Sequence, residues 1–178
     1  ATTMAERKKP HVWFTMSGVL AATAFPSAED PERMEMQMPG DKWPEFHDGE
    51  DYNLHEHCQP VRPMIEYLRR LKDQGYSVGL ATRAKSNAER ASKETWLKNY
   101  GLYDCFNLGV KFTFGPLAAV QTAKSAAEAN GMTLAECLLV TDDYRLARNA
   151  MQRGMPALHI ANVITGMAEP GGNMFPKM

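Results

Sequence analysis

The sequence predicts an α/β fold in which helices cover both faces of a doubly wound parallel sheet, giving three layers. Short apolar segments alternate with amphipathic ones along most of the 178 residues, which indicates strands that are followed by helices. The strand segments are apolar at consecutive positions, as in strands that are buried on both faces of a sheet. This length is typical of one domain, so we expect a single domain over residues 1–178.

The individual elements follow from local signals. Residues 12–16 form an apolar run that ends at Ser-Gly, which is typical of a buried strand that stops in a turn. After Pro63, apolar residues recur at helical spacing until Gly75, which favours a helix between them. The remaining strands are expected at residues 77–81, 105–114, 137–141 and 157–161. The remaining helices are expected from Ser86 or Asn87 to Gly101, from 117 to 130, and from 144 to 153.

Residues 21–60 differ from the rest of the chain in charge and in pattern. They contain 10 of the 21 acidic residues and only two basic ones, so their net charge is −8 in a chain of net charge −1. Five of the 11 prolines also lie there, and no helical or strand period is sustained. We expect a loop-rich insertion outside the core. The core is then expected at 11–20 and 61–161, with a tail at 162–178.

The composition excludes several classes of protein. Hydrophobic residues make up 44% and charged residues 23% of the chain, which is ordinary for a globular domain. Three cysteines without a close pair argue against a disulfide framework or a cysteine zinc module. No apolar run approaches the roughly 20 residues of a membrane span, and residues 1–10 lack the apolar stretch of a secretory signal. We therefore expect a soluble intracellular protein, in the cytoplasm or an organelle matrix.

Three segments, in order, resemble motifs of the haloacid dehalogenase-like (HAD) hydrolase superfamily. Residues 15–20, Thr-Met-Ser-Gly-Val-Leu, follow the first strand, where the family has Asp-x-Asp-Gly-x-(Leu or Val). Residues 79–82 resemble the second motif, a strand that ends in Ser or Thr, and residues 139–143 resemble a later strand that ends in an acidic cluster. The resemblance covers roughly residues 11–161. It implies a Rossmann-like HAD fold with residues 21–60 as a cap-like insertion after the first strand.

The resemblance implies a phosphatase site, and the chain departs from that site at its charged positions. In the family the first Asp attacks phosphorus and binds magnesium, and the second is the acid/base; Thr15 and Ser17 stand there. A hydroxyl is a weak nucleophile without a base, a poor magnesium ligand and no acid near neutral pH. The lysine of the family is expected near residues 115–117, which contain none. Lys111 and Lys124 are the nearest candidates.

The remaining polar positions also have structural explanations. Strand-end hydroxyls often form local hydrogen bonds, which we expect at Thr15, Ser17 and Thr82; a retained phosphate contact at Thr82 is the alternative. Asp142 and Asp143 are expected to cap the following helix and are weak metal candidates. Leu146 stands where the family often has a further acid. We therefore expect no cofactor, and magnesium only if the chain is an active phosphatase.

Two further groups of residues allow a functional and a structural interpretation. A solvated acidic loop is favoured over a metal site for His47, His55, His57 and Cys58, because no zinc spacing is met. A solvated helix face is favoured over a nucleotide or nucleic-acid site for Arg83, Lys85, Arg90 and Lys93.

Together these observations predict a non-catalytic HAD-like pseudo-phosphatase that acts as a structural or binding component in a protein complex. Trp43 and Phe46 are expected to anchor a basic protein partner on the acidic insertion. One alternative is an active phosphatase or nucleotidase, a phosphoric monoester hydrolase. It would use Thr15 as nucleophile, or Asp142 or Asp143 with a metal-bound water. The other alternative is a module that binds phosphate or a nucleotide.

Overall fold

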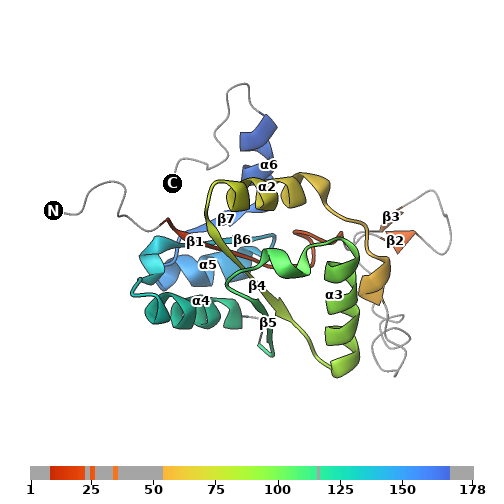
Figure 1. Cartoon of the computed structure of the whole chain (residues 1–178), viewed down its shortest axis with the longest axis horizontal. Coiled ribbons are helices and arrows are strands. Elements are labelled where there is room, and N and C mark those ends of the chain that lie inside the picture. Colours follow the sequence, from red (N-terminus) through yellow and green to blue (C-terminus); the bar gives the residue numbers. More distant parts are fainter. Residues whose placement is uncertain (1–8, 23–24, 27–33, 36–53, 116, 169–178) are drawn as a thin grey trace.

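The described part of the chain contains one parallel sheet with helices on both faces (Figure 1). The structure is a computed structural model that describes residues 9–22, 25–26, 34–35, 54–115 and 117–168. Three residues singled out from the sequence, Trp43, Phe46 and His47, lie outside these ranges. Every helix in the described part is too short or too polar to cross a membrane.

The element bounds follow the sequence pattern closely. The strands of the main sheet are β1 (His11–Phe14), β4 (Ser77–Arg83), β5 (Val110–Thr113), β6 (Cys137–Thr141) and β7 (Ala157–His159). The helices are α2 (Arg62–Asp73), α3 (Asn87–Asn99), α4 (Ala118–Ala129), α5 (Tyr144–Gln152) and α6 (Ile160–Ala168). Short elements are the hairpin strands β2 (Phe25–Pro26) and β3 (Met34–Glu35) and the 3-10 turns η2 (Leu54–His57), η3 (Tyr103–Cys105) and η4 (Leu134–Glu136).

The three most buried strands, β4, β1 and β6, are the central ones. The strand order is β5-β4-β1-β6-β7, and every neighbouring pair is parallel. In the register, Val12 of β1 lies opposite Val78 of β4 on one side and Leu138 of β6 on the other. All residues of β1 and β6 are buried. The three-layer α/β architecture predicted from the alternating pattern is therefore confirmed.

Alternate side chains of the strands supply two separate cores. Val12 and Phe14 pack with apolar residues of α2, α3 and α6 on one face of the sheet. Trp13 points to the other face, where it packs with the alanine-rich side of α4 and with α5. The Trp13 ring also covers Gly79 of β4, where an added Cβ would lie 2.5 Å from a ring carbon. A glycine at this position therefore makes room for the indole.

The two ends of the acidic insertion lie side by side at the carboxyl end of β1. The Ala22 amide donates to the Gln59 carbonyl oxygen at 2.7 Å, and the Val61 amide donates to the Leu20 carbonyl oxygen at 2.8 Å. Cys58 is buried in the core beside α2 and α3. The expectation that residues 21–60 lie outside the core is therefore wrong at the ends of the segment.

Two boundaries differ from the sequence-based expectation. The strand expected at 157–161 ends at His159, and α6 begins at Ile160. Val163 of α6 is buried in the core that includes α2, so part of the expected tail is an ordered helix. The irregular strand expected at 105–114 is a 3-10 turn followed by the short strand β5. Apolar residues continue through both boundaries, which hides them in the sequence pattern.

Candidate functional site

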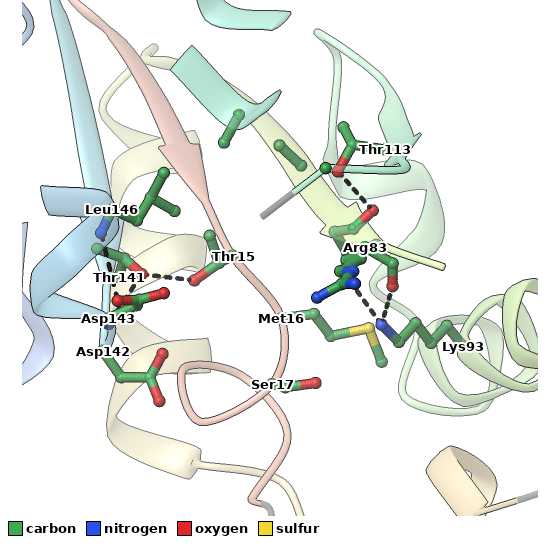
Figure 2. A pocket seen from close by; sticks show the side chains of 14 residues that line it. Thr15, Met16, Ser17, Arg83, Lys93, Thr113, Thr141, Asp142, Asp143 and Leu146 are labelled. Atoms are coloured by element: carbon green, nitrogen blue, oxygen red, sulfur yellow. Dashed lines mark hydrogen bonds between the residues drawn. The ribbon is translucent and has the colours of Figure 1, made fainter. Parts of the chain in front are cut away.

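A cavity of about 210 Å³ lies at the carboxyl ends of the central strands (Figure 2). Ligands of open α/β sheets bind at this edge. All five polar positions singled out from the three motifs line the cavity: Thr15, Ser17, Thr82, Asp142 and Asp143. The other lining residues are Met16, Ala81, Arg83, Lys93, Thr113, Gly115, Ala119, Thr141 and Leu146. Figure 2 shows the polar groups of the β1 and β6 ends facing Arg83 and Lys93 across the cavity.

The Thr15 side chain is held by a second hydroxyl. Its Oγ1 donates to Thr141 Oγ1 at 3.2 Å, and Thr141 Oγ1 also accepts from the Asp143 backbone amide at 3.1 Å. The Thr15 amide donates to the Val140 carbonyl oxygen, which continues the ladder between β1 and β6. The bond between the two hydroxyls joins the ends of two neighbouring strands, 126 positions apart in sequence, so the local hydrogen bond expected for Thr15 is not the one observed. No base takes part in it, so the contact does not activate Thr15.

Ser17 contacts the insertion instead of its own neighbours. Its Oγ lies 3.4 Å from Nε2 of His55, which is buried in η2. The strand-end interpretation is therefore wrong for Ser17. An imidazole is a hydrogen-bond partner that can also accept a proton near neutral pH.

Asp142 packs against Gly18, at a position where there is no room for a side chain. Gly18 has φ +76°, a backbone conformation that favours glycine, and an added Cβ would lie 2.0 Å from Asp142 Oδ2. Burial raises the pKa of Asp142 above its ordinary value, and the nearby Asp143 raises it further, while His159 acts in the opposite direction. The carboxylate of Asp142 is thus held in an unfavourable environment.

Asp143 has the capping role expected from the sequence. Its Oδ1 accepts from the backbone amides of Arg145 at 2.8 Å and Leu146 at 3.2 Å, at the start of α5. A carboxylate at this position satisfies two amides that have no partner within the helix. The capping prediction is confirmed for Asp143 and wrong for Asp142, whose carboxylate faces Gly18.

Lys93 brings a buried cation to the cavity from α3. The residue is 3% exposed, and its Nζ donates to Thr82 Oγ1 at 3.0 Å and to the Arg83 carbonyl oxygen. Its ion-pair partner is Glu89, one helical turn earlier, with Nζ and Oε1 3.4 Å apart. Burial lowers the pKa of Lys93, and the charge of Glu89 partly restores it.

Comparison with solved structures identifies the fold. A HAD-superfamily hydrolase of subfamily IA from Geobacter sulfurreducens has a TM-score of 0.60 and 18% identity over 84% of this chain and 85% of that chain. A HAD family hydrolase from Deinococcus radiodurans, with bound phosphate and sodium, has a TM-score of 0.56 and 14% identity over 85% and 80%. This chain has a HAD-like fold. No protein-family model and no curated protein matches the sequence, and at these identities the likeness shows the fold alone.

The HAD-like cavity does not fit a magnesium site of the family type. Magnesium prefers carboxylate oxygens in octahedral geometry. Positions 15 and 17, where the family has carboxylates, carry hydroxyls, and the carboxylate of Asp143 is used as a helix cap. Asp142 is then the one carboxylate among the lining residues without such a structural role. Within the described residues, no group of three or more His, Cys, Asp or Glu side chains is placed to hold a metal ion.

The buried cation of the cavity is neither of the two lysines considered from the sequence. Neither Lys111 nor Lys124 lines the cavity; Lys111 is exposed on β5, and Lys124 on α4 lies near Glu128. Lys93 lines the cavity because α3 starts beyond the carboxyl end of β4. The solvated-face interpretation is therefore wrong for Lys93. A signal was present in the sequence, since the buried positions of α3 are Glu89, Ser92, Lys93, Trp96 and Leu97, a single helical stripe.

The other basic residues after β4 fit the expected solvated face better. Lys85 and Arg90 are exposed, and Arg90 lies over the Phe112 ring at 4.8 Å and pairs with Glu94 at 3.4 Å. Arg83 is also exposed but lines the cavity. Of the four basic residues, Arg83 and Lys93 therefore line the cavity, and Lys85 and Arg90 lie outside it.

Of the histidine and cysteine group considered from the sequence, the structure describes the side chains of His55 and Cys58. The carbonyl oxygen of Cys58 accepts from the Trp96 indole at 2.8 Å, and burial raises the pKa of the Cys58 thiol to about 11. Cys58 is therefore a protonated core residue at neutral pH. The His57 side chain, like His47, lies outside the described part of the chain.

Proposed function

We propose that this HAD-like chain is a pseudo-phosphatase, which keeps the phosphatase fold, does not transfer phosphoryl groups and acts as a structural or binding component. The observation that carries the proposal is the set of partners around Lys93. An ammonium group has three protons, and here the three acceptors are Thr82 Oγ1, the Arg83 carbonyl oxygen and Glu89. The charge is thus already balanced within the chain. A phosphate ester in the cavity would have to compete with Glu89.

The nucleophile position supports the same proposal. A catalytic hydroxyl needs a base within hydrogen-bond reach. The Thr15 hydroxyl donates to Thr141, whose side chain has no basic group. Phosphoryl transfer also depends on positive groups aimed at the developing charge. With Lys93 neutralised by Glu89, Arg83 is the remaining cation among the lining residues, and it is exposed.

A second candidate function rests on the contact between Ser17 and His55. A serine Oγ at 3.4 Å from an imidazole Nε2 is a loose form of the nucleophile and base arrangement of hydrolases. In this alternative the chain is an active phosphatase with Ser17 as an atypical nucleophile. His55 would take the proton of the hydroxyl as the oxygen attacks phosphorus and would give it to the leaving oxygen as the ester P–O bond breaks. Water would then release phosphate from Ser17.

Turnover of p-nitrophenyl phosphate by the full chain, with magnesium in excess, distinguishes the two functions. We expect the wild type to release nitrophenol no faster than Ser17→Ala. Turnover that Ser17→Ala or His55→Gln abolishes, while Thr15→Val retains it, would contradict the pseudo-phosphatase and support the second candidate.

Retained ligand binding is tested separately by a thermal shift with inorganic phosphate. A ligand that binds only the folded state raises the melting temperature. If the neutralised Lys93 leaves a phosphate site through Arg83 and Thr82, the shift should disappear in Arg83→Gln. No shift in the wild type assigns the protein to structural or protein-binding roles instead of phosphate binding.

A further inference from the structure

A second groove lies beside the edge strand of the sheet. It has a volume of about 740 Å³ and lies between β5 and α4. On the β5 side it is lined by Leu108, Lys111, Phe112, Thr113, Phe114 and Gly115, and on the α4 side by Ala118, Gln121, Thr122, Ser125 and Ala126. Thr113 and Gly115 also line the first cavity, but none of the motif residues lines this groove.

The backbone of β5 offers hydrogen-bonding groups at this edge. β5 is the outermost strand and pairs with β4 on one side; on its other side, no strand of the described residues pairs with it. The Ala84 amide donates to the Thr113 carbonyl oxygen at 3.1 Å, so the backbone groups of Thr113 face β4. In a parallel strand alternate residues face opposite sides. The amide and carbonyl groups of Phe112 therefore point away from the sheet, and Phe114 follows directly after the end of the strand.

The side chains at the edge combine apolar and basic groups. Phe114 is 88% exposed, which is the highest value among the exposed large apolar residues of the described chain. Phe112, two positions earlier and within β5, lies beneath the Arg90 guanidinium group. Lys111 projects to the opposite face and is exposed. It is the single ionisable residue lining the groove, and the α4 side adds hydroxyl and amide groups that can donate to a carboxylate.

We propose that β5 and this groove bind an extended acidic segment of a partner protein as an additional strand of the sheet. Strand addition of this kind uses backbone bonds for affinity and alternate side chains for specificity. Alternate apolar residues of the partner lie against Phe112 and Phe114. The acidic residues between them enter the groove and face Lys111. The proposal does not depend on whether the first cavity is catalytic.

A second copy of this chain is a poorer occupant of the same edge. Residues 108–115 contain Lys111 and no acidic residue. Antiparallel pairing of two copies about Phe112 would bring the two Lys111 side chains to diagonal positions on one face, where like charges repel. Charge complementarity therefore favours a partner that carries carboxylates.

The probe for this proposal is a phage-displayed library of linear ten-residue peptides, selected against the full chain. We expect enriched peptides in which acidic and apolar residues alternate. Lys111→Glu should weaken their binding at least about fivefold, because it removes an attractive charge and adds a repulsive one. Phe114→Ala should weaken it as well. Methylation of alternate peptide amides should abolish binding, since an added strand needs those donors.

Matched controls separate this edge from general surface effects. Lys124→Glu makes the same charge change on α4 outside the groove, and Met151→Ala removes an exposed apolar side chain from α5. Both should bind the peptides like the wild type. The proposal is overturned if no peptide is enriched, if enriched peptides are basic or uncharged, or if Lys111→Glu binds them unchanged. It is also overturned if the chain self-associates through this edge, as shown by a dimer that Phe114→Ala dissociates.

Discussion

Lys93 is a charged side chain in the interior of the protein, and Glu89 is the reason that it stays there. The side chains of the pair are 4% and 9% exposed. A buried ion pair contributes little net stability, but removing one partner leaves an uncompensated charge. The negative charge that balances Lys93 comes from Glu89, one turn earlier in the same helix, with Nζ and Oε1 3.4 Å apart.

Replacing one partner of the Lys93–Glu89 pair should lower the free energy of unfolding much more than replacing both partners. We expect Glu89→Ala to lower the free energy of unfolding by about 3 kcal/mol, and Glu89→Gln with Lys93→Met to change it much less. Urea denaturation measures both values. The exposed pair Lys124 and Glu128 is the control, where Glu128→Ala should cost less than about 0.5 kcal/mol. Equal losses at the two sites would contradict the account of Lys93.

Asp142 should destabilise the protein at neutral pH. Its pKa is raised by burial, so between its ordinary and its folded pKa the folded state binds more protons than the unfolded chain. The stability contributed by this group therefore falls as pH rises through that window and stays low at pH 7. Asp142→Asn should raise the melting temperature at pH 7, and raise it less near pH 3, where the acid is protonated in both states.

The control for this prediction is Asp143→Asn. It removes a neighbouring charge and keeps a side chain that caps helices well, so its melting temperature should change little. A lower melting temperature for Asp142→Asn at pH 7 would show instead that the carboxylate makes a favourable contact.

At the scale of single elements, the start of α5 is stabilised by its N-cap residue, Asp143. Asp143 accepts from two amides at the start of the helix. Replacement by alanine removes both bonds, and we expect Asp143→Ala to lower the free energy of unfolding by about 1 kcal/mol. Thermal denaturation followed by circular dichroism checks this value. A loss as large with Asp143→Asn would mean that charge, not capping, is responsible.

Strand β4 depends on the space that Gly79 leaves for Trp13. An alanine Cβ would lie 2.5 Å from the indole ring, which must then shift within a packed core. We expect Gly79→Ala to lower the free energy of unfolding by about 2 kcal/mol. Gly115→Ala is the matched control, because the nearest atom to its Cβ would be 3.9 Å away. If both variants have wild-type stability in urea, the ring is not held as described.

The sequence predicted the positions of the strands better than it predicted which lysine lines the cavity. Apolar runs such as 137–141 coincide with a strand because burial on both faces demands them. The motif order also placed Thr15, Thr82 and Asp142 at one sheet edge, since parallel strands end together there. Lys93 was missed because a lysine normally faces solvent, and only its spacing from Trp96 indicates the buried side of α3. The contact of Ser17 with His55 joins residues 38 positions apart, and no local pattern predicts it.

At the scale of the whole molecule, the acidic insertion begins and ends at neighbouring points. Two hydrogen bonds, from the Ala22 amide to Gln59 and from the Val61 amide to Leu20, hold these points together beside the carboxyl end of β1. A segment with adjacent ends adds little strain to its host, and its closure entropy rises only about 0.6 kcal/mol for each doubling of length. The stability of the sheet therefore depends very little on the length of the segment at residues 21–60. Insertions of very different size and chemistry can therefore begin and end at this position, between Ala22 and Val61.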